Sequence, residues 1–216
     1  MPGKTRRSPR ERQASGQLSH YWARFKTLGG NRFRIDTRIY LEPTVSPDDG
    51  DRVLGCIIGK NPGSATPAKR TAQPTPIVLD GDKFLPTVLS VVRKAYAAAG
   101  APVPSGAYVR VLNLFYLCDR DLSQAKRSLA TIRRAPPYPE EKQHYPWAWY
   151  AWGGPDRLLD PLKTRFDDLR SDSCFYYARD RDRIMTKRPS SRDLAKHTQG
   201  MPQAKVVSHL SQLIRG

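Results

Sequence analysis

The sequence predicts an α/β fold, a three-layer sandwich in which helices cover both faces of a mostly parallel, four-stranded central sheet. Short apolar runs bounded by turn residues indicate buried strands, and amphipathic segments between them indicate helices. The two kinds of segment alternate along the chain. Such alternation favours right-handed crossover connections and therefore a parallel sheet sandwiched by helices.

The N-terminal part is expected to add β structure to this sheet. Residues 1–17 are basic and have nothing to bury, so we expect a disordered arm, either a solvated tail or a non-specific attractant for DNA. The stretch RFRIDTRIYL at 32–41 alternates apolar and polar residues, which indicates a half-buried β extension. The length of 216 residues suits one domain, which we place at 18–216.

Four buried strands are expected in the rest of the chain. They are the apolar runs at 53–58, 108–117, 147–152 and 174–178. The run at 53–58 ends in Gly and Pro, and the run at 147–152 ends in two glycines, as expected where a strand gives way to a turn. Residues 119–145 are rich in Pro, Arg and Glu and are predicted to form a surface insertion.

Three helices are expected between and after these strands. Asp82 can cap a helix over 82–100 whose apolar positions fall on one face: Leu85, Val88, Leu89, Val92 and Tyr96. A second helix is predicted over 155–170, with one apolar side: Leu158, Leu159, Leu162, Phe166 and Leu169. A basic loop at 186–202 leads to a terminal helix at 204–214.

The charge of the chain predicts a polyanionic partner. Lys and Arg number 37 against 20 Asp and Glu, for a formal net charge of +17. Such a surplus is typical of nucleic-acid-binding proteins, although ribosomal proteins and membrane-surface binders share it. Arginine predominates, and its planar fork suits phosphate oxygens. We expect the partner to be double-stranded or single-stranded DNA.

Other compositional features exclude several classes. The chain has no apolar stretch long enough to span a bilayer, and its basic N-terminus lacks the apolar segment of a secretory signal. Cys56, Cys118 and Cys174 lie far apart in or beside apolar runs, as expected for small buried thiols in a reducing cytoplasm. The four histidines share no ligand-like spacing, so we expect no metal. We expect a cytoplasmic monomer.

The turn Gly59-Lys60-Asn61-Pro62-Gly63 follows the first buried strand. In open parallel sheets, ligands bind beyond the carboxyl ends of the strands, where this turn is expected to lie. Its glycines allow a tight backbone path, and the Asn61 amide can donate and accept hydrogen bonds. By itself an Asn-Pro-Gly sequence also fits an ordinary β-turn.

In its wider context the chain resembles the uracil-DNA glycosylase superfamily, in particular the mismatch-specific and thymine-DNA branch. Members of that branch carry G-x-N-P-G after the first buried strand, where this chain has GKNPGSA at 59–65, and a helix opening that corresponds to DKFL at 82–85. The superfamily's second signature is an H-P-S loop before the last helix. This chain has Arg188-Pro189-Ser190 there, followed by Gly200. Some branches also place an asparagine on the second strand, as at Asn113.

The resemblance implies roles for three residues. Asn61 would position the attacking water through its amide oxygen, and Asn113 would read the edge of the base, although an asparagine there also fits a bond to loop backbone. Arg188 replaces the usual histidine. Its guanidinium would either stabilise the anionic O2 of the departing base or clamp a phosphate.

The resemblance also implies which residues surround the base and the DNA. A tyrosine fills the position of Gly63 in the strictly uracil-specific branch and blocks groups at C5, so Gly63 admits thymine or bulkier 5-substituted pyrimidines. The predicted base-binding residues are Gly63, Ser64, Phe84 and Asn113, and the predicted DNA-binding residues are Lys60, Lys187, Pro189, Ser190, Ser191 and Arg192. Six aromatic residues would either supply a base-stacking platform or pack in the core: Phe84, Phe115, Tyr116, Trp147, Trp149 and Trp152.

These expectations combine into a functional prediction. The chain is predicted to be a monofunctional DNA glycosylase, a hydrolase that flips out an altered pyrimidine, modified at C5, and cleaves its N-glycosidic bond. This reaction needs no cofactor. Repair of damage and attack on foreign DNA with modified bases, as in antiviral defence, both fit. The alternatives are a non-catalytic DNA-binding protein on the same scaffold and an enzyme acting on another nucleotide substrate.

Overall fold

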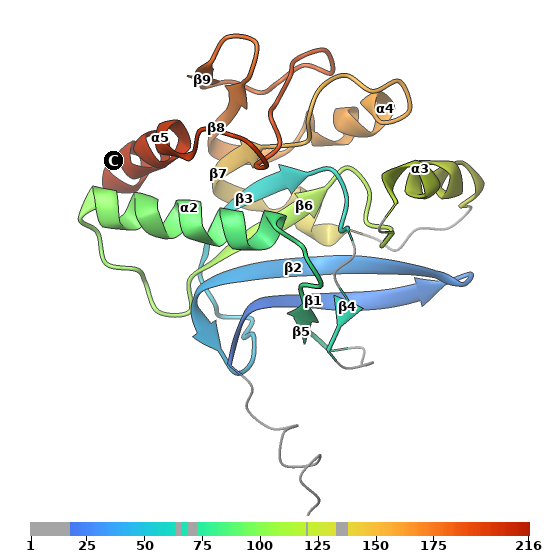
Figure 1. Ribbon diagram of the computed structural model, residues 1–216. Coiled ribbons are helices and arrows are strands. Elements are labelled where there is room, and N and C mark those ends of the chain that lie inside the picture. Colours follow the sequence, from blue (N-terminus) through green and yellow to red (C-terminus); the bar gives the residue numbers. More distant parts are fainter. Residues whose placement is uncertain (1–17, 64–65, 69–72, 120, 133–137) are drawn as a thin grey trace, which may run out of the picture.

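A nine-stranded sheet runs through the computed structural model (Figure 1), in the order β4-β5-β1-β2-β6-β3-β7-β8-β9. The structure describes residues 18–63, 66–68, 73–119, 121–132 and 138–216, so the arm predicted at 1–17 lies outside the described residues. The α/β class is confirmed. The prediction of a mostly parallel, four-stranded sheet is wrong, because the described part of the sheet has nine strands and three of its eight strand pairings are parallel.

The parallel part of the sheet consists of its four central strands. In sheet order these are β6 (Tyr108–Asn113), β3 (Val53–Gly59), β7 (His144–Tyr150) and β8 (Arg170–Ala178). They coincide with the four predicted buried strands, with ends shifted by several residues. The sheet is larger than predicted because antiparallel strands add to both of its sides.

The largest addition is a hairpin of β1 (Ser19–Leu28) and β2 (Asn31–Thr44). Its turn is Gly29-Gly30, with φ of +56° and +77°, a conformation that glycine adopts without strain. The half-buried character predicted for 32–41 is wrong, because every residue of 33–41 is buried. β2 lies between β1 and β6, so its polar side chains are enclosed as well as its apolar ones.

Buried ion pairs accommodate those polar side chains. Asp36 accepts hydrogen bonds from Arg38 Nε at 3.1 Å and Arg38 Nη2 at 3.3 Å, and it also pairs with Arg24 and Arg110. Asp36 has φ of +48°, and the register of β1 against β2 shifts between Trp22 and Arg24. This irregularity turns the charged side chains toward one another, which a simple alternating pattern does not show.

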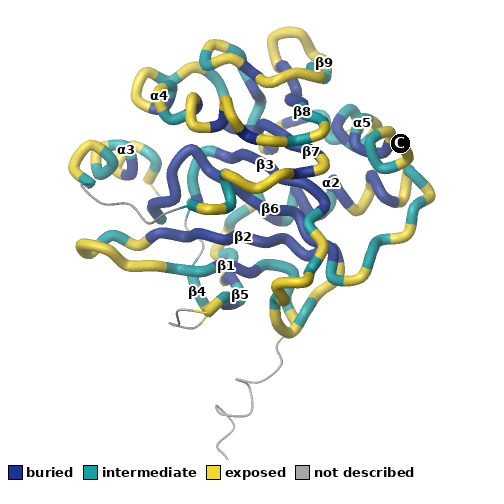
Figure 2. The backbone as a smooth tube through the Cα atoms, turned by 180° about the vertical axis from the view of Figure 1, so that it is seen from behind, coloured by how far each residue is buried: buried dark blue, intermediate teal, exposed yellow. Residues whose placement is uncertain are grey.

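Helices cover both faces of the sheet, which gives three layers (Figures 1 and 2). On one face α2 (Phe84–Ala99) and α5 (Gln203–Arg215) pack on Ile57, Val109 and Trp149. On the other, α3 (Leu122–Thr131), α4 (Asp160–Lys163) and the 3-10 turn η2 (Thr164–Phe166) cover a second core. The remaining elements are short: β4 (Thr66–Pro67), β5 (Thr75–Val78), η1 (Pro139–Lys142) and β9 (Arg183–Met185).

Two of the three predicted helices are confirmed, and the third is much shorter than predicted. α2 and α5 match the helices expected at 82–100 and 204–214. The helix predicted over 155–170 is reduced to α4 and η2, because Pro161 fits only the first turn of a helix and β8 already begins at Arg170. The insertion predicted at 119–145 contains α3, which Asp121 caps by accepting from the backbone N–H groups of Ser123 and Gln124.

The carboxyl ends of the four parallel strands lie at one edge of the sheet. Gly59 ends β3, Asn113 ends β6, Tyr150 ends β7 and Ala178 ends β8, and Gly59 and Asn113 are paired in register. The loops that leave this edge carry most of the residues that the sequence singles out.

Candidate functional site

A cavity of about 760 Å³ opens where the turn after β3 meets the start of α2 and the loop before α5. It is lined by Arg34, Asn61, Pro62, Gly63, Gly81, Asp82, Lys83, Phe84, Thr87, His197, Thr198, Gln199, Gly200, Met201 and Gln203. These residues come from three loops at the carboxyl edge of the sheet and from β2. This is where open α/β sheets bind ligands.

The turn after β3 supplies one wall of this cavity. Asn61 Nδ2 donates to the backbone carbonyl of Asp119 at 3.5 Å, which fixes the direction of the amide. Gly63 has φ of +66°, and a Cβ built on it meets nothing within 4 Å, so the space beside it is open. The structure therefore brings Asn61 and Gly63 together, as predicted. Ser64 lies outside the described residues.

The start of α2 supplies the aromatic wall. Asp82 Oδ1 accepts from the backbone N–H of Phe84 at 2.7 Å and of Leu85 at 3.4 Å, which confirms the predicted cap. Phe84 is only half-buried, and its ring centroid lies 5.0 Å from that of His197, with 31° between the planes. An aromatic ring and an imidazole thus line the same cavity.

His197 is held in the neutral form. Burial lowers its pKa to about 4, the nearby cations of Lys60 and Lys196 act in the same direction, and Asp82 opposes them. At neutral pH the imidazole therefore has one N–H donor and one acceptor nitrogen. A neutral donor of this kind can bond an oxygen on which negative charge develops.

We expect His197 to make the fold less stable at acidic pH. The unfolded chain binds a proton at His197 below its ordinary pKa of 6.5, whereas the folded chain does so only below about 4. The free energy of unfolding therefore decreases as pH falls from about 6.5 to 4. His197→Gln should reduce that decrease, as measured by urea melts at several pH values. His144→Gln, at an exposed histidine, is the control, and an unchanged pH slope in the His197 variant would contradict the assignment.

Asn113 adjoins the cavity without lining it. Its side chain is 1% exposed, and neither Nδ2 nor Oδ1 has a hydrogen-bond partner among the described residues. A Cβ built on Gly59 would lie 3.0 Å from Phe84 Cζ and 3.1 Å from Asn113 Oδ1. The amide thus lies close to the aromatic wall, and it is unsatisfied, which is unusual for a buried polar group. The alternative in which it bonds loop backbone has no support among these contacts.

The structure does not bring Arg188 to this cavity. Its guanidinium donates to the backbone carbonyl of Leu169, next to Arg170, the first residue of β8 and thus at the opposite end of that strand. Pro189 is buried, and Ser190 bonds Asp193 Oδ2 through both its backbone N–H and its hydroxyl, at 2.8 and 3.0 Å. The described bonds of Arg188 and Ser190 are therefore with Leu169 and Asp193, and neither residue lines the cavity.

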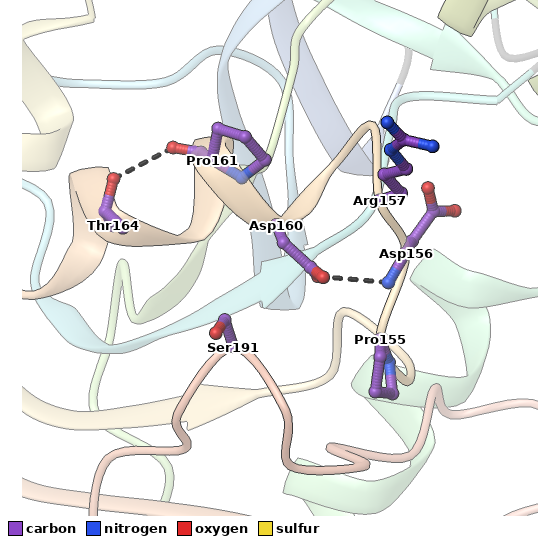
Figure 3. Close-up of a pocket in the computed structure, with 7 residues that line it drawn as sticks. All are labelled: Pro155, Asp156, Arg157, Asp160, Pro161, Thr164 and Ser191. Atoms are coloured by element: carbon purple, nitrogen blue, oxygen red, sulfur yellow. Dashed lines mark hydrogen bonds between the residues drawn. The ribbon is translucent and has the colours of Figure 1, made fainter.

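Ser191 lines a different, open depression (Figure 3). The other residues that line this depression come from the segment before α4, from α4 and from the start of η2: Pro155, Asp156, Arg157, Asp160, Pro161 and Thr164. The Ser191 carbonyl accepts from Lys163 Nζ at 2.9 Å, and this bond holds the loop against α4. Lys187 and Arg192 are exposed. Lys187 and Arg192 are therefore accessible to a large anionic partner, whereas Pro189 is buried and is not.

Lys60 lies between the cavity and this second region. Burial lowers its pKa; Asp156 opposes that effect, and the cations of Lys126 and Lys163 add to it. Its Nζ would be 3.4 Å from a Cβ built on Gly153. Lys60 is therefore partly enclosed, and its charge acts on His197 as well as on any bound anion.

The aromatic residues divide between the cavity and the core. Phe84 lines the cavity, while five others are buried in the two cores: Phe115, Tyr116, Trp147, Trp149 and Trp152. Sequence reasoning missed His197 and Arg34. His197 could have been found by searching for the histidine of the second signature, since it precedes Gly200 and the last helix. Arg34 carried no such signal, because the alternating pattern placed it on an exposed face.

Comparisons with known proteins add no assignment: no family model, no curated protein and no solved structure matches the chain. Within the described ranges, no cluster of three or more His, Cys, Asp or Glu side chains is arranged to hold a metal ion. No helix in the described part of the chain is long and apolar enough to cross a membrane.

Proposed function

We propose that the chain is a monofunctional DNA glycosylase that removes an altered pyrimidine, modified at C5, without a cofactor. The observation that carries the proposal is the meeting of Asn61, Gly63, Phe84 and His197 in one cavity at the carboxyl edge of the parallel strands. This set provides an amide, open space, an aromatic face and a neutral imidazole. Repair and defence against modified foreign DNA are both compatible with this chemistry.

Each of these groups has a task in cleaving an N-glycosidic bond. The flipped base stacks on Phe84, while the Asn61 amide oxygen accepts from the water that attacks C1′ of the sugar. As the C–N bond breaks, the bond's electrons move onto the base, and the His197 N–H donates to its O2. The proton lost by the attacking water passes to solvent, and the departing base anion takes up a proton from solvent. This role moves from Arg188 to His197 because only His197 lines the cavity. Because the imidazole is already neutral, it can donate this hydrogen bond to the base while keeping its proton.

Attraction to DNA follows from the charge of the chain. The net charge of +17 makes association electrostatic, and exposed Lys187 and Arg192 are available for phosphates. Binding should therefore weaken steeply with salt, since each neutralised phosphate releases condensed counterions. We propose that the protein acts as a cytoplasmic monomer on double-stranded or single-stranded DNA.

Replacing Gly63 by Tyr is expected to reduce excision of 5-substituted pyrimidines about tenfold or more relative to uracil, because the new ring would occupy the open space beside the base. Gly63→Ala is the matched control. It carries the same cost of a positive φ, about 1 kcal/mol, without the bulk. Competition assays on mixed substrates measure the ratio, and an equal loss on all substrates would refute the role of Gly63.

The proposal is tested by incubation with duplexes that contain uracil, mismatched thymine, 5-hydroxymethylcytosine or its glucosylated form. Alkali then cuts the strand wherever a base has been removed. We expect cutting on at least one modified pyrimidine and its loss in His197→Ala, with Arg188→Ala retaining activity. Cutting on none of these substrates, together with salt-sensitive DNA binding, would contradict the proposed activity.

One observation favours a second candidate, a non-catalytic DNA-binding protein. Asp82 is the one carboxylate among the described residues that line the cavity, and both its oxygens are engaged, Oδ1 with the start of α2 and Oδ2 with Arg34. An acidic general base is thus absent from these lining residues. The same substrates discriminate the two candidates, because the second binds every duplex and releases no base.

A further inference from the structure

Arg34 contributes a buried cation to the cavity. It lies on β2, lines the cavity and is only 1% exposed, so its guanidinium belongs to the enclosed part of the wall rather than to the rim. Its backbone N–H donates to the Tyr116 carbonyl at 2.9 Å, which anchors the residue between the hairpin and the chain that follows β6. The backbone of Arg34 is therefore held both by its strand and by the segment that follows β6.

The guanidinium forms a long ion pair with Asp82, but two of its three nitrogens have no hydrogen-bond acceptor in the described part of the chain. Neither Nε nor Nη1 has a hydrogen-bond partner among the described residues. The nearest carboxylate oxygen is Asp82 Oδ2, which is 3.7 Å from Nη1 and thus beyond hydrogen-bond length. The other oxygen of Asp82 is already taken by the start of α2. An arginine stays charged in proteins, and a buried charge without hydrogen bonds is costly.

Arg38, four residues further along β2, shows how a buried guanidinium is usually satisfied. It is 6% exposed, and two of its nitrogens bond both oxygens of Asp36 at 3.1 and 3.3 Å. The same strand thus satisfies one buried guanidinium within the fold and leaves the other facing the cavity. Lys83 also lines the cavity, so cations outnumber carboxylates two to one among its described lining residues.

We propose that Arg34 is an anion-binding residue and that the ligand of this cavity carries an oxyanion, a carboxylate or a phosphate, that bonds its free nitrogens. The inference rests on the proposed function only in taking the ligand to be a pyrimidine nucleotide. Two sources supply the same chemistry. One is a carboxylate on the base, and the other is the phosphate of a mononucleotide. Guanidinium groups bind both strongly.

Calorimetric titration of the full chain tests this proposal with four probes: 2′-deoxyuridine, its 5′-monophosphate, 5-carboxy-2′-deoxyuridine and inorganic phosphate. We expect at least one anionic probe to bind about tenfold or more tightly than 2′-deoxyuridine, as one charge-assisted hydrogen bond supplies. Preference for the monophosphate or inorganic phosphate identifies a phosphate, and preference for the carboxylated nucleoside identifies a base carboxylate. Equal affinity for charged and neutral probes would overturn the proposal.

Two variants locate the effect. Arg34→Gln should abolish the preference for anions, so that the charged and neutral probes bind it with similar affinity. Asp82→Asn keeps an acceptor for the start of α2 and removes the competing charge, so it should strengthen anion binding severalfold even if Arg34→Gln does not fold. If Asp82→Asn only destabilises the chain and leaves anion binding unchanged, Arg34 serves as the partner of Asp82 and the proposal fails. Base release is measured in a separate assay. The titrations therefore still test the role of Arg34 if no glycosylase activity is found.

Discussion

Asn61→Ala is expected to lower the single-turnover rate of base release by about 100-fold or more, the usual effect of removing one positioned polar group at a reacting centre. The physical reason is the direction of the amide. Because Nδ2 is turned toward the Asp119 carbonyl, Oδ1 remains for a water molecule in the cavity. Single-turnover assays on the best substrate from the duplex panel measure the effect.

Two further variants make this prediction specific. Asn61→Asp retains an acceptor oxygen and adds a base but loses the bond to the Asp119 carbonyl, so its rate should exceed that of Asn61→Ala. Asn31→Ala, in the hairpin and away from the cavity lining, should change the rate by less than about twofold. An Asn61→Ala variant that is fully active would remove the turn after β3 from the mechanism.

Gly55→Ala is expected to destabilise the fold by about 3 kcal/mol, at the upper end of the usual cost of overpacking. A Cβ built on Gly55 would lie 2.2 Å from Trp147 Cδ2, and Trp147 is buried under the helices. Because the indole is buried in the core, the contact can be relieved only by a shift of the ring or of β3 against β7. The free energy of unfolding from urea melts measures the effect.

Gly154→Ala is the matched control for Gly55→Ala. Its Cβ would meet Leu194 at 3.4 Å, an ordinary contact, so its effect should stay within about 0.5 kcal/mol. If the two variants were equally stable, the close packing of β3 against β7 would be contradicted. Because the turn that carries Asn61 leaves the end of β3, the Gly55 variant should also lose activity in proportion to its unfolded fraction.

The central part of the fold was predictable because its signals are local. The four parallel strands are continuous apolar runs, and α2 has a cap, a helical apolar face and the terminal glycine Gly100. The hairpin was not predictable in full. Arg34, Asp36 and Arg38 read as solvent-facing residues. Their burial depends on ion pairs with one another and with residues elsewhere in the chain, and on the irregular backbone at Asp36.

The candidate site was predicted in part for a similar reason. Asn61, Gly63 and Phe84 follow strand and helix ends, whose positions the sequence indicates, and the structure brings them together. Arg188 was chosen because Pro189 and Ser190 follow it, yet its guanidinium bonds the Leu169 carbonyl, and the same loop lines the cavity only further along, from His197. The course of a long loop depends on tertiary contacts such as the bond between Lys163 and the Ser191 carbonyl.

The central claim is that a pyrimidine base is released in the cavity formed by Asn61, Phe84 and His197. Mass spectrometry of the small molecules freed from the duplex panel tests it most directly, because it detects the base itself. We predict that the unmodified chain releases one free modified pyrimidine and leaves an abasic site, and that His197→Ala and Asn61→Ala release little or none. Equal release by these two variants and the unmodified chain, or no free base from any duplex, would contradict the claim.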